Sequence, residues 1–240
     1  MIYGEILAGG KGTRMGNTEM PKQFLKINDK PIIIHTLEVF LLNTKIDKVI
    51  ITTPKQWIQH TNDLIDKFIP VSLKEKVRVC KGGSDRNESI MSGIKFIEEN
   101  YGINEDDVIV THDAVRPFLT QRIIDDNIRQ AMEFGACDTV VPAFDTIVES
   151  KNGQDISDIP RRDFMYQGQT PQSFNIKELV SLYNTLNDEE KRILTDAAKI
   201  FVVKGREVKL VQGEVYNMKI TTPYDLKLAN ALVRDEINDK

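Results

Sequence analysis

Two positively charged residues follow a glycine-rich turn near the start of the sequence. Residues 6–12 read Ile-Leu-Ala-Gly-Gly-Lys-Gly, and Arg14 and Lys22 come just beyond them. Because glycine has no Cβ, its backbone can turn sharply and bring N–H groups close to a ligand, and clustered N–H groups favour anions such as phosphate. The alternative, an exposed turn with ordinary surface charges, explains less well why both cations and Pro21 occur together. The stretch therefore predicts a phosphate-binding loop.

Two familiar phosphate-binding motifs fit this loop incompletely. The dinucleotide fingerprint Gly-x-Gly-x-x-Gly begins at Gly10 and Gly12, but Met15 occupies the third glycine position. The P-loop requires Gly-Lys and then Ser or Thr after four free positions, and the sequence has no such run. The next apolar run ends in Thr-Thr-Pro at 52–54 rather than in an acidic residue, which also disfavours a dehydrogenase.

Two further polar clusters follow apolar runs. Residues 82–89 read Gly-Gly-Ser-Asp-Arg-Asn-Glu-Ser, and residues 112–117 read His-Asp-Ala-Val-Arg-Pro. In the first cluster, Asp85 with Glu88 three residues later predicts the start of a helix, whose free N–H groups can face a ligand. In the second cluster, Asp113 offers a carboxylate directly after a strand, which suits Mg²⁺ held between phosphates.

Each of these residues also has a purely structural interpretation. Asp85 is expected to cap its helix whether or not it contacts a ligand, and Ser89 could equally be a buried helix hydroxyl. We interpret His112 as a structural histidine rather than a base. Arg162 could belong to an exposed basic pair, and Lys219 could be an ordinary strand lysine. Only the wider pattern of motifs distinguishes these alternatives.

The composition is that of an ordinary globular protein. Its 240 residues are 40% hydrophobic and 28% charged, with a net charge of −4, so nucleic acid and anionic membrane are not expected as partners. No apolar run approaches the ~20 residues of a membrane span, and the first residues lack the basic region of a signal peptide. Cys80 and Cys137 show neither metal spacing nor a disulfide framework. We expect a cytoplasmic protein.

The elements that must position these clusters alternate between strand and helix, which predicts a three-layer, mostly parallel, Rossmann-like α/β sheet of the nucleotidyltransferase type. Functional residues of such a sheet gather at the carboxyl ends of its strands. The expected strands cover 2–8, 49–51, 77–80, 108–110, 140–141, 200–203 and 208–211. The expected helices cover 31–42, 57–68, 85–97, 123–134, a stretch from about 177, and 222–233. Asn175 with Glu178 three residues later, and Thr222 with Asp225, predict the starts of the last two.

The alternation breaks between residues 142 and 172. Short apolar runs at 147–149 and 155–156 flank Lys151-Asn152-Gly153, and Asn-Gly is a strong hairpin signal. We therefore expect a single domain over 1–240 with a projecting β-hairpin arm at about 142–172. Because an isolated hairpin is only marginally stable, the arm is expected to meet a second copy of the chain in a homodimer.

Six motifs along the whole chain carry a family resemblance. They are LAGGxGTRM with PKQF, KGGSDRNES, HDAVRPF, YQGQTPQSF, LTDAAK and YNMKITTPYDLKLA. In this order they resemble the ribitol-5-phosphate cytidylyltransferases, and the sister 2-C-methyl-D-erythritol 4-phosphate cytidylyltransferases share most of them. The opening MIYxxILAGGxGTRMG, the HDAVRP form and the Tyr-Gln-Gly at 166–168 favour the ribitol branch. The sister enzyme of isoprenoid synthesis stays the alternative.

The resemblance implies the reaction of CTP with D-ribitol 5-phosphate to give CDP-ribitol and pyrophosphate, with Mg²⁺ as cofactor. CDP-ribitol would feed teichoic acid synthesis in the cell wall, and a separate ribulose-5-phosphate reductase would supply the polyol phosphate. A regulatory protein that kept the fold but lost turnover is a further alternative, which predicts loss of Arg14, Lys22 or Asp113; all three are present.

The resemblance also assigns roles to individual residues. Arg14 and Lys22 would stabilise the transition state, Asp113 would bind the metal, and Arg162 and Lys219 would position the substrate phosphate. Arg162 and Thr146 would act across the dimer interface. The nucleotide-binding residues would be Leu7, Ala8, Gly9, Gly10, Gly82, Gly83, Ser84, Asp85, Arg86, Asn87, Glu88, Ser89, Asp113 and Ala114. The substrate-binding residues would be Thr146, Arg162, Thr170, Thr195 and Lys219.

Overall fold

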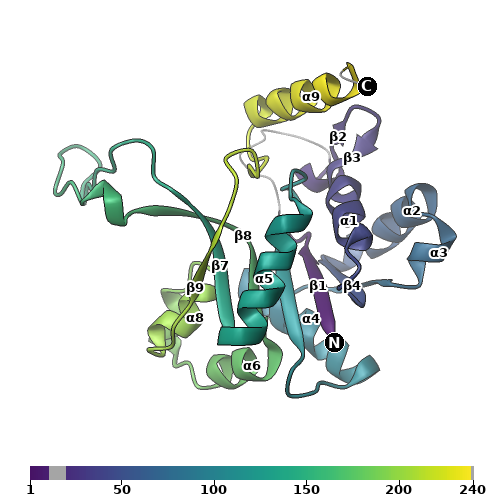
Figure 1. Cartoon of the computed structure of the whole chain (residues 1–240), viewed down its shortest axis with the longest axis horizontal. Helices are drawn as coiled ribbons and strands as arrows, with labels where there is room; N and C mark the ends of the chain where they lie inside the picture. Colours follow the sequence, from purple (N-terminus) through teal and green to yellow (C-terminus); the bar gives the residue numbers. More distant parts are fainter. Residues whose placement is uncertain (11–19, 239–240) are drawn as a thin grey trace.

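The computed structural model of the chain describes residues 1–10 and 20–238, with the side chains of the last helix described up to Val233 (Figure 1). Within these residues, seven strands form one sheet in the order β5-β4-β1-β6-β8-β7-β9. β8 runs antiparallel to both of its neighbours, and all other neighbouring strands are parallel, so the predicted mostly parallel sheet is confirmed. The strands are β1 (Ile2–Leu7), β4 (Lys48–Thr53), β5 (Val77–Lys81), β6 (Val108–Asp113), β7 (Ala136–Pro142), β8 (Tyr166–Asn175) and β9 (Lys209–Gln212).

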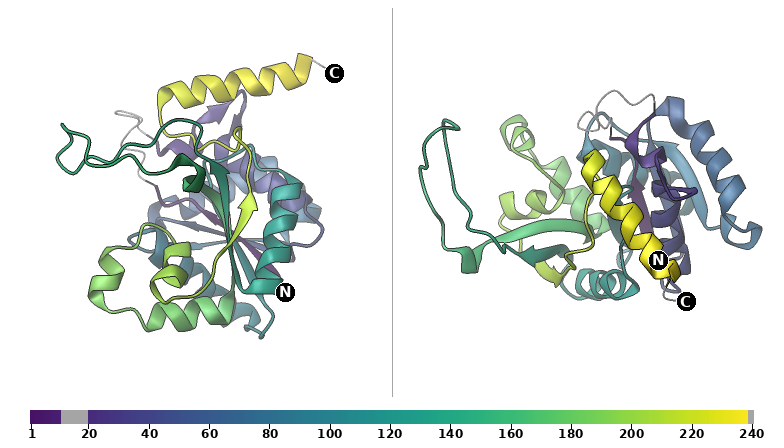
Figure 2. Two further views of the ribbon diagram at one scale, coloured as in Figure 1. Left: turned by 60° about the vertical axis from the view of Figure 1, so that its left-hand side comes forward. Right: turned by 90° about the horizontal axis from the view of Figure 1, so that it is seen from above.

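Helices cover both faces of the sheet and bury an apolar core on each side (Figures 1 and 2). One core lies under α1, α2 and α5, and the other under α4, α6 and α8. A smaller cluster joins α9 to β2 (Lys26–Ile27), which pairs with β3 (Lys30–Pro31). The helices are α1 (Ile32–Leu42), α2 (Ile58–Phe68), α3 (Val71–Lys74), α4 (Arg86–Tyr101), α5 (Gln121–Phe134), α6 (Ile176–Asn184), α7 (Asp188–Arg192), α8 (Ala198–Val203) and α9 (Pro223–Asn238). None of the described helices is long and apolar enough to cross a bilayer.

The predicted helix starts are confirmed by their caps. The Asp85 side chain accepts the Glu88 N–H at 2.8 Å, and the Asn175 side chain accepts the Glu178 N–H at 3.0 Å. At the start of α9, the Thr222 hydroxyl accepts the Asp225 N–H while the Asp225 carboxylate accepts the Thr222 N–H. Each cap satisfies N–H groups that the first turn of a helix leaves free.

One predicted strand is wrong. Residues 200–203 lie in helix α8, which packs Ile200 and Phe201 into the core beneath α6. A run of four apolar residues does not distinguish a strand from one buried turn of helix. Gly205, at φ 68°, then ends the helix in a left-handed conformation that favours glycine.

The segment between β7 and β8 projects from the body as an arm (Figures 1 and 2). Its two sides are joined by one isolated bridge between Glu149 and Asp158, without the longer ladder of a regular hairpin in this part of the chain. The Asn152 side chain closes the tip by accepting the N–H groups of Gln154 and Asp155, each at 2.9 Å. Gly153 follows at φ 72°. The Asn-Gly signal thus marks the turn.

Candidate active site

A cavity of about 420 Å³ opens at the carboxyl ends of β1 and β6. Its lining comes from loops that are far apart in the sequence, as expected for ligand sites of parallel sheets. The lining residues are Leu7, Gly9, Gly10, Lys22, Gln23, Gly83, Ser84, Asp85, Arg86, Ser89, Asp113, Ala114, Val115, Lys219 and Thr221. The fold therefore gathers most of the candidate nucleotide-binding residues around one cavity.

The first loop contributes a buried cation. Lys22 begins the short 3₁₀ turn η2 (Lys22–Phe24) and is only 7% exposed, yet it lines the cavity. The neighbouring Gln23, which sequence reasoning did not single out, donates from Nε2 to the Ala8 carbonyl at 2.7 Å. That bond ties the segment that carries Lys22 to the end of β1. Arg14 lies outside the described residues.

The loop before α4 is built by its own side chains. Glu88 accepts both the N–H and the hydroxyl of Ser84, at 2.9 and 2.6 Å. The Ser89 hydroxyl accepts the Gly83 N–H and donates to the Asp85 carbonyl. A Cβ on Gly83 would lie 2.3 Å from Cβ of Glu88, so only glycine fits there. Several candidate nucleotide-binding side chains thus shape this loop, and Gly82 and Glu88 line a second hollow beside the cavity.

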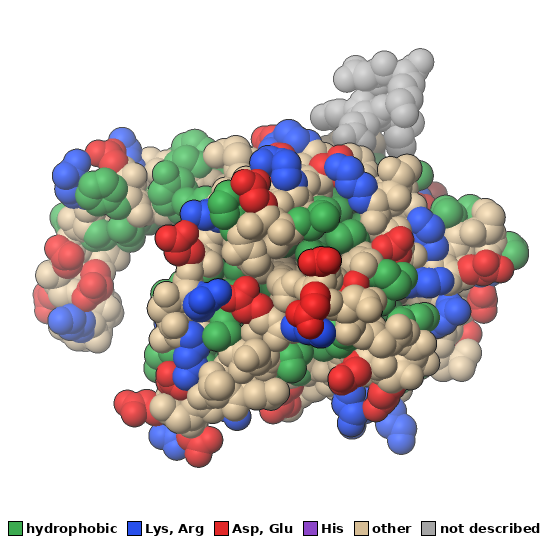
Figure 3. Space-filling model, turned by 60° about the horizontal axis from the view of Figure 1, so that its bottom comes forward, with side chains coloured by type: hydrophobic (Ala, Val, Ile, Leu, Met, Phe, Trp, Pro, Cys, Tyr) green, Lys and Arg blue, Asp and Glu red, His purple; other side chains and the backbone are tan. Residues whose placement is uncertain are grey.

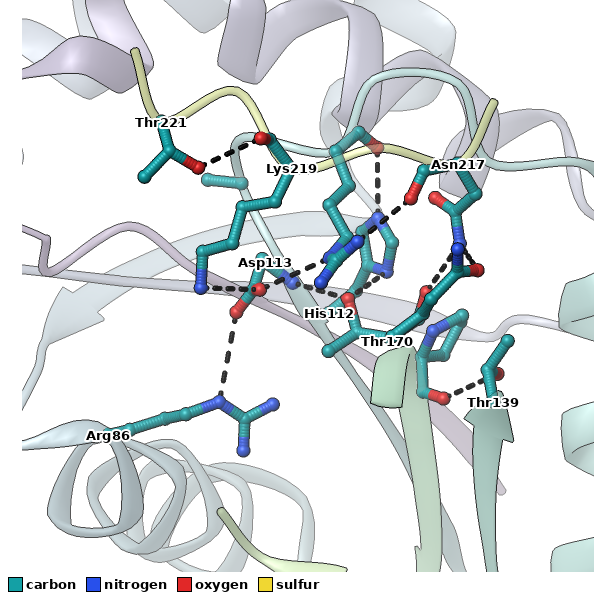
Figure 4. A network of polar contacts seen from close by, with 12 residues as sticks. Arg86, His112, Asp113, Thr139, Thr170, Asn217, Lys219 and Thr221 are labelled. Atoms are coloured by element: carbon teal, nitrogen blue, oxygen red, sulfur yellow. Dashed lines mark hydrogen bonds and ion pairs between the residues drawn. The ribbon is translucent and has the colours of Figure 1, made fainter. Parts of the chain in front are cut away.

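Asp113 is the centre of the charges in the cavity (Figure 4). Its Oδ2 lies 2.9 Å from Lys219 Nζ and 3.4 Å from Arg116 Nε, and its Oδ1 lies 3.7 Å from Arg86 Nε. Burial alone would raise the pKa of this carboxyl, but Arg86, Lys219 and Arg116 outweigh burial and hold the pKa well below its usual range. Asp113 is therefore an anion throughout the neutral range.

A chain of hydrogen bonds behind Asp113 fixes its backbone. The Asp113 N–H donates to the Thr170 hydroxyl at 3.2 Å, and that hydroxyl lies 2.9 Å from Nδ1 of His112. Nε2 of His112 faces the Arg116 carbonyl at 3.0 Å, and burial lowers the pKa of the imidazole to about 4. We assign the neutral tautomer that donates from Nε2 and accepts the Thr170 proton at Nδ1, because a carbonyl can only accept. The structural interpretation of His112 agrees with this contact set.

Arg116 was part of a recognised motif but received no role from the sequence. Its side chain also donates from Nη1 to the Asn217 carbonyl at 2.8 Å. Asn217 is fully buried and donates in turn to the Thr170 carbonyl at 2.8 Å. These bonds fasten the segment that carries Lys219 to the loop after β6 and to β8 (Figure 4). Its place in the HDAVRPF motif, three residues after Asp113, was the only sequence signal for Arg116.

Some candidate residues lie away from the cavity. Arg162, in the 3₁₀ turn η4 (Arg162–Phe164), and Thr146 are exposed on the arm, and Arg162 donates to the Phe144 carbonyl at 3.1 Å. Thr195 is exposed near α8, while Thr170 is buried behind Asp113. None of these four residues lines the cavity of its own chain.

The cavity can bind a polyanion. Three cations line it in the described part of the chain, namely Lys22, Arg86 and Lys219, and Arg116 lies behind the cavity against the Asp113 carboxylate. Such a concentration of one sign attracts phosphate groups. Among the described residues, no group of three His, Cys, Asp or Glu side chains is arranged to hold a metal by itself.

Comparison with known proteins decides the family. The family model described as 2-C-methyl-D-erythritol 4-phosphate cytidylyltransferase matches residues 3–235. The chain belongs to this family. It is 58% identical over 233 residues to the ribitol-5-phosphate cytidylyltransferase of Lactiplantibacillus plantarum, covering 97% of this chain and 98% of that protein.

Solved structures of the family have the same fold. The 4-diphosphocytidyl-2C-methyl-D-erythritol synthase of Anaerococcus prevotii is 26% identical with a TM-score of 0.78, over 97% of this chain and 96% of that one. The 2-C-methyl-D-erythritol 4-phosphate cytidylyltransferase of Francisella tularensis is 27% identical with a TM-score of 0.78, over 96% and 98%. The protein is thus a cytidylyltransferase, as its motifs predicted.

Proposed function

We propose that this cytidylyltransferase makes CDP-ribitol and pyrophosphate from CTP and D-ribitol 5-phosphate. The observation that carries the choice of polyol is the 58% identity to a ribitol-5-phosphate cytidylyltransferase along almost the whole of both chains. The motifs of the ribitol branch support the same choice. The product would serve teichoic acid synthesis in the cytoplasm, with ribitol 5-phosphate supplied by a separate reductase.

The reaction joins two anions. A phosphate oxygen of the polyol attacks the α-phosphorus of CTP, the bond from that phosphorus to the β-phosphate oxygen breaks, and pyrophosphate leaves with the electron pair. Positioning and charge neutralisation are the main barriers to such a transfer. Because the attacking phosphate is already ionised near neutral pH, no strong general base is needed. This agrees with a site rich in cations, in which His112 is neutral and bonded on both sides.

The cavity lining has groups for each part of this task. Gly9, Gly10 and the loop at 83–86 would hold the nucleotide, and Lys22 would stabilise the charge that develops during transfer. Lys219 would position the polyol phosphate, since Asp113 fixes its ammonium group at 2.9 Å. Arg14 is assigned to the transition state by its motif alone.

We further propose that Mg²⁺ binds together with the nucleotide. Asp113 fits this role because it is ionised and its Oδ1 meets Arg86 Nε only at 3.7 Å, beyond hydrogen-bond distance. When bound, the ion would neutralise charge on the phosphates. One carboxylate oxygen is enough, because Mg²⁺ usually takes few protein ligands and completes its shell with phosphate and water.

The homodimer is also part of the proposal. Its support is the arm, where large apolar side chains are exposed on a projection that packs little against its own chain (Figure 3). These side chains are Phe144, Val148, Ile156, Ile159 and Phe164. Exposed apolar groups in such number favour a protein partner. A symmetric partner would bring Arg162 and Thr146 of one chain to the cavity of the other.

The experiment is pyrophosphate release from CTP and Mg²⁺ with two polyol phosphates in parallel. We expect kcat/KM for D-ribitol 5-phosphate to exceed that for 2-C-methyl-D-erythritol 4-phosphate by at least about 100-fold, since even a small difference in substrate shape typically changes kcat/KM by about this factor. ATP and UTP serve as nucleotide controls. The reverse preference would replace our proposal by the isoprenoid enzyme.

A further inference from the structure

A row of four polar residues crosses the middle of the sheet beneath the cavity. The strand register pairs Glu5 with Thr111, Thr111 with Gln172, and Gln172 with Asp138. Residues opposite one another on neighbouring strands place their side chains on the same face. This face is the one under α4, because a Cβ on Gly93 of α4 would lie 2.3 Å from Oε1 of Glu5. Positions on a sheet face that a helix covers are usually occupied by apolar side chains.

Both acidic members of this row keep carboxyl oxygens without a hydrogen bond in the described part of the chain, although the Thr52 hydroxyl lowers the pKa of Glu5, and the Gln172 side chain and the Thr139 backbone lower that of Asp138. Glu5 is fully buried, and among the described residues neither of its carboxyl oxygens accepts or donates a hydrogen bond. The same holds for Oδ1 of Asp138 and Oε1 of Gln172. Burial raises the pKa of Glu5 well above its usual value and that of Asp138 to about 7. Burying such groups lowers the stability of a fold, so their presence calls for another explanation.

Arg86 is the common neighbour of both acids and of the cavity. Its Nε faces Asp113 at 3.7 Å, while Nη1 and Nη2 are buried and have no hydrogen-bond partner in the described part of the chain (Figure 4). The Arg86 charge acts on Glu5 and on Asp138, lowering the pKa of each against the effect of burial. The guanidinium is thus near enough to both acids to act on them electrostatically, while its Nε faces the carboxylate that lines the cavity.

We propose that Asp138 and Glu5 are positioning residues, which hold the Arg86 guanidinium at the floor of the cavity for the phosphates of the nucleotide. The proposal rests on the proposed function for the identity of that nucleotide. Buried donors and acceptors that are too far apart for a direct bond are commonly bridged by water, and the same arrangement suits Arg86 here. The carboxyl groups then act on catalysis without touching substrate.

If Asp138 serves to position Arg86 rather than to stabilise the fold, its replacement should impair CTP binding without lowering the melting temperature. Asp138 faces Arg86 from α4, Asp196 from the segment before α8, and Gln172 from β8. Because its pKa is raised on folding, wild-type stability falls as the pH rises through about 7, and Asp138→Asn removes this loss. The variant should therefore melt no lower than wild type at pH 8. A side chain kept only for the fold would give the opposite result.

The test is a double-mutant cycle on CTP affinity, measured by calorimetry with Mg²⁺ present. At pH 8, where Asp138 is mostly ionised, we expect Asp138→Asn to weaken CTP binding about tenfold in the wild-type background and to have no further effect in Arg86→Ala. We expect the same of Glu5→Leu, which removes the buried carboxyl group in either protonation state. Asp107→Asn is the matched control. Asp107 is as buried as Glu5, but it lies just before the start of β6, where it accepts the Asn104 N–H at 2.9 Å and pairs with the N-terminal ammonium group of Met1. Its loss should lower the melting temperature and leave CTP affinity unchanged.

The outcomes separate the two proposals. Wild-type CTP affinity in both Asp138→Asn and Glu5→Leu, or additive effects with Arg86→Ala, would overturn the positioning role. If the wild-type protein binds CTP but makes no CDP-ribitol, the proposed function alone is overturned, because the double-mutant cycle on CTP affinity still measures the role of Arg86. If the wild-type protein does not bind CTP, both the proposed function and the positioning role are overturned.

Discussion

Replacing Asp113 by asparagine removes the carboxylate that contacts three cations. The Asp113 carboxylate lies 3.4 Å from Arg116 and 3.7 Å from Arg86. At an effective dielectric constant of about 20, unit charges at these distances attract by about 4–5 kcal/mol before the cost of desolvation is subtracted. Lys219 is 38% exposed, so solvent screens its contact and we discount it. Removing one partner of a largely buried pair typically lowers stability by about 3–5 kcal/mol, because the remaining charges stay buried without compensation. We expect Asp113→Asn to unfold about 3 kcal/mol more easily at pH 7.

The pH dependence follows from the depressed pKa of Asp113. The stabilisation is fully present above the unfolded-state pKa, near 4, and disappears as the pH falls through the lower folded-state pKa. The difference in the free energy of unfolding between wild type and variant should therefore be constant from about pH 5 to about pH 8 and should shrink below about pH 4.

Thermal unfolding at several pH values measures this difference, and about 3 kcal/mol corresponds to a shift of roughly 6–12 °C for a chain of this size. Asp125→Asn is the control, because Asp125 pairs with Lys45 on the surface at 3.1 Å and should contribute under about 1 kcal/mol. If both variants melt within about 2 °C of wild type at pH 7, the cation cluster does not stabilise the fold as reasoned.

Three further predictions concern the reaction and the assembly. Lys22→Ala and Arg14→Ala should each lower kcat about 10²–10³-fold in folded protein, and near-normal turnover would remove their transition-state role. Thr170→Val should leave the Asp113 N–H without an acceptor and lower stability by about 2 kcal/mol in chemical unfolding, whereas an unchanged midpoint would contradict the hydrogen-bond chain. Arg162→Ala and Lys219→Ala should each be nearly inactive. After the two variants exchange subunits, about half of the dimers are hybrids with one intact site each, so about a quarter of the wild-type number of active sites should return. No recovery despite exchange would exclude the cross-subunit role.

Much of the fold was predictable because its signals are local. The caps at Asp85 and Asn175 follow from residue types three positions apart, and the parallel strands follow from short apolar runs between helices. The helix at α8 was missed because its four apolar residues suit either state. The register that places β8 antiparallel between β6 and β7 depends on tertiary packing, which no local pattern specifies.

The candidate site was predictable where a motif carries its own chemistry. Asp113 and Lys219 belong to separate motifs, and the structure brings them to 2.9 Å. The roles of Thr170 and Arg116 were not visible, because they arise from contacts between segments distant in sequence. Glu5 gave no signal either, since an acidic residue in an apolar strand shows its significance only when its neighbours across the sheet are known.

The charge balance around Asp113 bears on the order of binding. A carboxylate that already meets Lys219, Arg116 and Arg86 has little attraction left for a divalent cation, because three positive side chains repel it. The triphosphate of CTP would reverse the sign of the local field and supply most of the oxygen ligands that Mg²⁺ prefers. We therefore expect calorimetry to detect no Mg²⁺ binding to the free protein and clear binding once CTP is present. Tight binding of Mg²⁺ without nucleotide would show that the cations do not outweigh the carboxylate, and our account of Asp113 would need a different arrangement of its partners.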